Sequence, residues 1–113
     1  MKLTLAEKCF LYRHRNKLTR LAAAQRLRVD VAAIKHVEHS IGTKLNALPH
    51  IEIEEPYEEF LIRRRRAGLS QMDLQRARVW SHVTVTHYER GRLGAKPHIL
   101  AKLRDFLRSR SMT

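Results

Sequence analysis

Cysteine is almost absent from this sequence, and long apolar runs are missing altogether. The 113 residues include a single cysteine, Cys9, so no disulfide can form within the chain, which is typical of a reducing compartment. No stretch approaches the ~18 consecutive apolar residues of a membrane span. Charged residues near the N-terminus also interrupt any apolar secretory leader. The sequence therefore predicts a soluble, cytoplasmic protein that does not contact a membrane.

Acidic residues and catalytic motifs are also scarce. The chain has 23 Lys+Arg against 11 Asp+Glu, and its formal net charge is +12. We find no glycine-rich phosphate loop, no nucleophile motif and no ligand spacing typical of zinc, so we predict no catalytic residue, no metal, no cofactor and no enzyme activity. The excess of positive charge predicts a polyanionic partner.

The charge is divided along the chain. Residues 1–50 are basic, and residues 61–113 hold 13 Lys+Arg against 3 Asp+Glu. Between them, residues 51–60 contain five glutamates. One interpretation is a solvated linker that leads into a helix, because Pro56 suits a first helical turn and the glutamates that follow suit the positive end of the helix dipole. The other interpretation is an acidic surface that docks on a basic neighbour.

An internal repeat is visible when the chain is shifted by 51 residues against itself. Leu18 to Ala23 then align with Leu69 to Leu74 without a gap. Arg13 aligns with Arg64, and the sequence His36-Val37-Glu38 aligns with His87-Tyr88-Glu89. Apolar, capping and basic classes stay in phase over about thirty residues, so we interpret the pattern as a tandem duplication.

Each repeat is predicted to be a series of short helices. In the second, a helix over 56–66 ends at Gly68, and Ser70 caps the next helix with Asp73 completing an acidic capping box. Ser81 caps a third helix, glycines predict a turn at 91–94, and Pro97 opens a last apolar-faced helix. Thr19 and Asp30 hold the equivalent cap positions in the first repeat. The predicted fold class is all-α.

The second repeat resembles a known family. Residues 64–71 (RRRAGLSQ), Leu74, Val85, residues 88–92 (YERGR) and Pro97 are similar to the helix-turn-helix domain of the lambda-repressor and Cro-like family. Residues 5–48 resemble it less closely. The resemblance implies two lambda-repressor-like helix-turn-helix units in tandem: residues 1–50, an acidic linker at 51–55, and residues 56–113. The second unit departs from the family at the turn, where Val79 replaces the usual glycine, so a distorted turn is expected.

The resemblance also implies which residues would contact double-stranded DNA. In the second unit the recognition helix would span residues 81–90, with bases read by His82, Val83, Thr86 and His87, and with phosphates held by Ser70, Gln71, Arg90 and Arg92. In the first unit it would span residues 30–39, with Val31, Ala32, Lys35 and His36 as readers and with Arg20 and His39 on phosphates. The first set has fewer hydrogen-bonding groups, so it favours thymine methyls, non-specific DNA contact or a protein contact.

The function expected from these features is a sequence-specific DNA-binding transcriptional regulator, a repressor of phage, plasmid or prokaryotic origin, located on the nucleoid when bound to DNA. An alternative is an antitoxin-type protein that binds a partner protein and represses its own operon. The family commonly dimerises, so we consider both a homodimer and a pseudo-dimer within one chain. Of the four arginines at 63–66, at least two are expected to be solvated or bonded within the chain.

Overall fold

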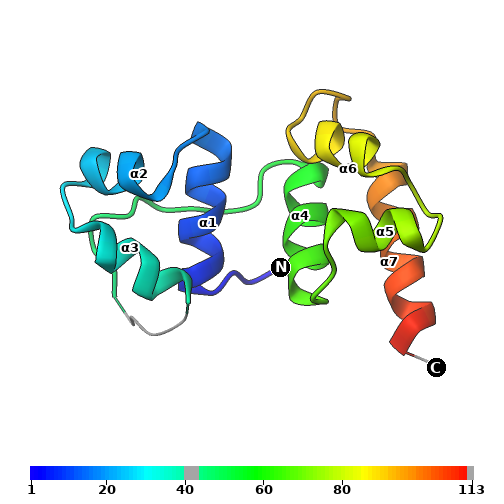
Figure 1. Ribbon diagram of the computed structural model, residues 1–113, viewed down its shortest axis with the longest axis horizontal. Coiled ribbons are helices and arrows are strands. Elements are labelled where there is room, and N and C mark those ends of the chain that lie inside the picture. The colour runs from blue at the N-terminus through cyan, green and yellow to red at the C-terminus, as the bar shows by residue number, and fades with distance from the viewer. Residues whose placement is uncertain (40–43, 112–113) are drawn as a thin grey trace. The chain divides into compact units, whose positions relative to one another are not determined.

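The computed structural model of the protein describes residues 1–39 and 44–111 and divides the chain into two compact units, Met1–Glu52 and Ile53–Thr113. Each unit is built from short helices (Figure 1), and the described residues contain no strand. The all-α prediction is confirmed for this part of the chain. No helix there is long and apolar enough to cross a membrane.

In residues 1–39 and 44–52 the first unit contains the helices α1 (Leu5–Asn16), α2 (Arg20–Leu27) and α3 (Val31–Glu38). Thr4 and Glu7 form a capping box at the start of α1, and the Thr19 hydroxyl accepts from the backbone N–H of Ala22 at the start of α2, as predicted. Asp30 stands at the N-cap of α3 but makes no side-chain capping bond, so only its position was predicted correctly. The core consists of small and medium side chains: Cys9, Ala24, Ile34, Val37 and Leu45.

The described part of the second unit, residues 53–111, contains the helices α4 (Pro56–Arg66), α5 (Gln71–Arg76), α6 (His82–Glu89) and α7 (Pro97–Ser111). Helix α4 packs on α6 and α7, and α5 packs on α6. The predicted capping box is confirmed: the Ser70 hydroxyl accepts from the Asp73 N–H at 3.0 Å, and the Asp73 carboxylate accepts from the Ser70 N–H at 2.7 Å. The core is larger and partly aromatic: Phe60, Leu74, Val85, Tyr88, Ile99, Leu100 and Leu103.

Aromatic contacts hold α6 in the second unit. Phe60 meets Tyr88 and Trp80 edge to face, with ring centroids 5.2 Å and 5.4 Å apart. The Tyr88 hydroxyl donates to the carbonyl of Ala95 at 2.9 Å, and burial, together with the charge of Glu59, raises its pKa to about 12. Trp80 is half-buried and packs against the core of the second unit.

Glycines end α4 and α6, where the chain turns through the left-handed region. Gly68 has φ 71° and Gly91 has φ 76°. A Cβ atom on Gly91 would lie 3.0 Å from the Tyr57 ring. Larger residues are therefore disfavoured at this position both by the positive φ and by the contact with Tyr57. The turn predicted at 91–94 is confirmed.

The acidic stretch contributes to a helix start. Glu55 is the N-cap of α4, and the Glu58 carboxylate accepts from the N–H groups of Glu54 and Glu55 at 2.8 Å and 3.3 Å. Glu59 pairs with Arg63 at 2.7 Å and also with Arg104 of α7. Burial raises the pKa of Glu59, but the two arginines outweigh it and hold that pKa below its usual value. These contacts favour the helix-start interpretation of the stretch over the docking one.

The turns between the second and third helices of the two units differ by one residue. The left-handed residue is Arg28 in the first unit, where the family has its glycine, but Arg78 in the second, one position before the expected Val79. Helix α5 is two residues shorter than α2. The turn of the second unit thus departs from that of the first, as expected for the second unit. The first unit also lacks the glycine, at Arg28, and does not show this departure, so the missing glycine alone does not account for it.

Candidate nucleic-acid interface

Helices α5 and α6 form a short helix pair that begins at two serine caps. Ser70 caps α5, and the Ser81 hydroxyl accepts from the N–H of Thr84 at 3.2 Å at the start of α6. Hydrogen bonds from Ser70 lower the pKa of Asp73, which keeps its carboxylate charged beside the positive end of α5. Both helix starts are therefore locally stabilised, and α6 packs against α5 and α4.

A buried ion pair anchors the end of α6. Arg64 of α4 donates from Nε to Glu89 Oε2 at 2.6 Å and from Nη2 to Oε1 at 3.0 Å, with only 11% and 2% of the two side chains exposed. The Arg64 Nη1 group donates to the carbonyl of Leu69 at 2.7 Å, and the Gln71 amide donates to Glu89 at 3.0 Å. One guanidinium thus ties together α4, the α4–α5 loop and the last turn of α6.

The first unit contains the same arrangement 51 positions earlier. Arg13 donates to Glu38 at 2.6 Å and 2.8 Å and to the carbonyl of Leu18 at 3.2 Å. Arg20, which occupies the position of Gln71, donates to Glu38 at 3.1 Å. Burial raises the pKa of Glu38, but the two arginines outweigh it and leave that pKa below its usual value. The first unit therefore places an arginine on its glutamate at the repeat position where the second unit has a glutamine.

Cys9 completes the environment of Glu38. Its thiol lies 3.5 Å from Glu38 Oε2, and the residue is fully buried. Burial, with the nearby Glu38 charge, raises the pKa of Cys9 to about 12, so the sulfur stays protonated. Cys9 is therefore a small core residue of the first unit.

The predicted base readers of the second unit lie on α6 with different exposure. His82 and Val83 are exposed, with Val83 at 50%, whereas Thr86 and His87 are half-buried. The Thr86 hydroxyl lies 2.6 Å from Gln71 Oε1 and 2.8 Å from the carbonyl of His82, and its single proton serves these two acceptors. Because the buried stripe of α6 is formed by Val85 and Tyr88, Val83 and His87 lie on the side of the helix away from the core.

The predicted phosphate-binding residues of the second unit flank these readers. Ser70 and Gln71 stand at the start of α5, and Arg90, the C-cap of α6, and Arg92 are exposed just after α6. Two of them also make hydrogen bonds within the unit: Ser70 caps α5, and Gln71 bonds both Glu89 and Thr86. Gln71 therefore links the start of α5 to the body of α6.

In the first unit the predicted readers are all exposed on α3: Val31, Ala32, Lys35 and His36. The predicted phosphate pair, Arg20 and His39, lies together with the Arg20 Nη2 atom 3.4 Å from His39 Nε2. The structure thus brings Arg20, His39 and Glu38 into one cluster at the end of α3.

Two features of this surface were not foreseen from the sequence. The buried ion pairs of Glu38 and Glu89 were missed, although both their arginines and their glutamates recur at the repeat spacing, and that recurrence was the available signal. Two exposed apolar side chains were also missed. Leu21 on α2 is 58% exposed and Met72 on α5 is 39% exposed, and they too occupy equivalent positions in the two repeats.

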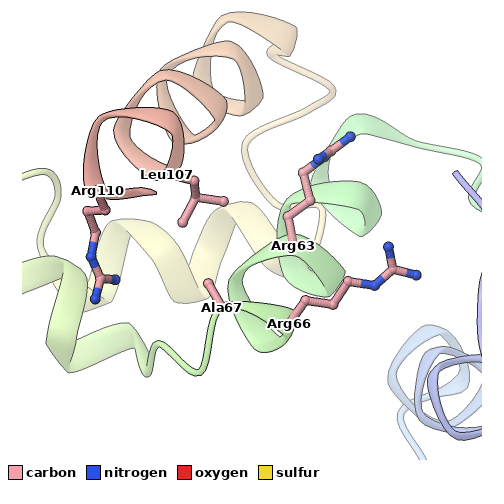
Figure 2. A pocket seen from close by; sticks show the side chains of 5 residues that line it. All are labelled: Arg63, Arg66, Ala67, Leu107 and Arg110. Carbon is pink, nitrogen blue, oxygen red and sulfur yellow. The ribbon is translucent and has the colours of Figure 1, made fainter. Parts of the chain in front are cut away.

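The second unit also has a concavity between the C-terminal ends of α4 and α7. It has a volume of about 440 Å³ and is lined by Arg63, Arg66, Ala67, Leu107 and Arg110. Figure 2 shows Leu107 and Ala67 between Arg110 on one side and Arg63 and Arg66 on the other.

The four arginines at 63–66 were expected to include at least two that are solvated or bonded within the chain. Arg63 bonds Glu59 and Arg64 bonds Glu89, so this expectation is confirmed. Within the described residues, no three metal-ligating side chains come together.

Comparison with known proteins finds one similarity, and it lies within the second unit. Residues 59–109 match a family model described as a helix-turn-helix domain. The match spans α5 and α6 and supports a helix-turn-helix DNA-binding family, of which DNA-binding regulators are typical. No curated protein and no solved structure matches the chain.

Proposed function

We propose that the protein is a sequence-specific transcriptional regulator that represses its target genes by inserting α6 into the major groove of DNA. The observation that carries the proposal is the anchoring of α6. Its buried end is held by Arg64 and Glu89, while its outer face presents His82, Val83 and His87. The helix-turn-helix match and the net charge of +12 support the same function.

In this proposal the residues around α6 have two roles. His82, Val83, Thr86 and His87 read base edges, since imidazole, methyl and hydroxyl groups suit the groups displayed in the major groove. Ser70, Gln71, Arg90 and Arg92 hold phosphates on either side and set the register of the helix on the duplex.

We further propose that the first unit is a second, divergent helix-turn-helix of the lambda-repressor-like type. Its support is the recurrence of the whole ion-pair arrangement, because Arg13, Leu18 and Glu38 make the contacts that Arg64, Leu69 and Glu89 make. A tandem duplication accounts for this recurrence. The chain would then comprise one unit at 1–50 and one at 56–113, joined by the residues at 51–55.

Two such units in one chain could cover two half-sites without dimerisation. Family members commonly read half-sites about one helical turn, roughly 34 Å, apart. Light scattering of the complex on a duplex that carries two half-sites tests the idea. We expect one chain per duplex, and a complex that contains only two chains would instead support a homodimer.

The function itself is tested by selecting bound sequences from a random duplex pool at ~150 mM salt, where non-specific binding is typically ~10⁻⁴–10⁻⁶ M. We expect a defined motif. The His87→Ala variant should relax the choice of base at one position, whereas Arg90→Ala should weaken all sequences about equally. Absence of any sequence preference for the unaltered protein would overturn the proposal.

A further inference from the structure

The side chain of Gln75 makes two hydrogen bonds with His82 at the start of α6. Gln75 Oε1 accepts from the backbone N–H of His82 at 2.8 Å and lies 2.7 Å from the His82 ring atom Nδ1. A backbone N–H can only donate, so the side-chain atom of Gln75 that faces it must be the amide oxygen. That oxygen can only accept, and therefore the Nδ1 atom of His82 carries a proton.

This contact decides what His82 offers to a ligand. A neutral imidazole carries one proton, so a ring protonated at Nδ1 has an unprotonated Nε2 with a free lone pair. The exposed nitrogen of His82 is then a hydrogen-bond acceptor. Donation from this residue to guanine N7 or O6, the contact expected from the residue type alone, is not open to the neutral ring in this arrangement.

The partner of the His87 ring is a hydrogen-bond donor, whereas that of the His82 ring is an acceptor. Its Nδ1 atom lies 3.4 Å from Arg92 Nη1. A guanidinium is only a donor, so Nδ1 of His87 is the acceptor in this contact, and a neutral ring then carries its proton on Nε2. The exposed nitrogen of His87 is therefore a hydrogen-bond donor, unlike that of His82.

We propose that the two histidines of α6 are held in opposite tautomers and read opposite groups on the base edges. His82 accepts from an exocyclic amine, adenine N6 or cytosine N4, whereas His87 donates to guanine N7 or O6, adenine N7 or thymine O4. Gln75 and Arg92 are the positioning residues that set this difference. The base-reading part rests on the proposed function, whereas the tautomer difference does not.

The tautomers are measured directly in the DNA-free protein. Two-bond ¹H–¹⁵N correlation spectra of ¹⁵N-histidine-labelled full-length protein distinguish protonated from unprotonated ring nitrogens. They are recorded at pH ~8.5, well above the reference pKa of ~6.5 for histidine in model peptides. We expect His82 with a protonated Nδ1 and His87 with a protonated Nε2. The same tautomer at both residues would overturn the proposal, whatever the protein does with DNA.

Variants of Gln75 separate positioning from a general structural role. Gln75→Ala removes the acceptor, so the His82 spectrum should shift towards Nε2 protonation while that of His87 stays unchanged. Gln75→Glu retains acceptor oxygens and should keep the Nδ1 proton of His82. If both variants perturb the spectra of His82 and His87 alike, the contact only stabilises the fold, and the assignment of Gln75 is wrong.

The reading itself is tested on the selected duplex by placing all four base pairs at each position of the motif. The position read by each histidine is the one at which His82→Ala or His87→Ala removes the preference. At the His82 position we expect adenine or cytosine on the contacted strand to bind about tenfold more tightly than guanine or thymine. Guanine preferred at both positions would overturn the base-reading part, while a protein that binds no DNA would overturn the proposed function and leave the measured tautomers standing.

Discussion

Cys9 and Ala23 occupy in the first unit the repeat positions that Phe60 and Leu74 occupy in the second, and all four are fully buried. The contacts of Arg13 with Glu38 and Leu18 nevertheless match those of Arg64 with Glu89 and Leu69. The larger core of the second unit is accompanied by α7, which supplies Ile99, Leu100 and Leu103 to it. The comparison teaches that the ion-pair arrangement can persist while the volume of the core changes around it.

The two units also differ in how they neutralise the buried glutamate. The partners of Glu89 include Arg64 and Gln71, whereas Glu38 is bonded by two arginines and lies beside a thiol. Arg64 is more deeply buried than Arg13, with 11% of its side chain exposed against 17%. The second unit should therefore depend more strongly on the ion pair between Arg64 and Glu89.

The largest effect is expected from Glu89→Ala. Removal of Glu89 leaves the guanidinium of Arg64 buried without its counter-charge, which typically costs about 3–5 kcal/mol in the free energy of unfolding. Urea unfolding measures this change in the free energy of unfolding, and it is followed by the fluorescence of Trp80, the one tryptophan of the chain. As a control, Asp105→Ala removes an acid that is 76% exposed and should change the value by less than about 0.5 kcal/mol. Equal effects of the two substitutions would contradict the burial argument.

A smaller effect is expected when the core of the first unit is made to resemble that of the second. Ala23→Leu introduces three heavy atoms at a fully buried position, and such overpacking typically costs about 1–3 kcal/mol. Urea unfolding followed by far-ultraviolet circular dichroism measures the change in the free energy of unfolding. The same substitution at the exposed Ala47 serves as the control and should have little effect. A stabilising Ala23→Leu would mean that the first unit has space that its contacts do not reveal.

The smallest effect concerns pH. The pKa of Glu38 is lower in the folded protein than its usual value, so the ion pair contributes stability above the unfolded pKa of about 4.3, and this contribution is lost as the pH falls through the folded pKa. We expect Glu38→Gln to flatten part of the decline in stability below pH ~4. Thermal unfolding of both proteins between pH 6 and 2.5 tests this, and parallel curves would show that Glu38 does not contribute.

Much of the local structure could be predicted because its causes lie within a few residues. The helix over 56–66, the box of Ser70 and Asp73, and the turn glycines all depend on neighbours in the chain. The turn before α6 was predicted only in part: a departure at this turn was expected, but the early end of α5 and the left-handed conformation of Arg78 were not. Asp30 was placed at its cap, but its lack of a capping bond could not be deduced from its type.

The sequence by itself determined the helices, their caps, the repeat and the positive charge, because helix propensity, capping and charge are local or additive properties. Only the tertiary structure decided which charges are buried, as for Arg64 and Glu89, and which atoms of the α6 side chains remain available. The proton position on His82 depends on Gln75 from another helix, and that on His87 on Arg92 beyond the helix end. A hydrogen bond requires two groups at a defined distance and angle, and residues from different elements reach that geometry only when the core has packed.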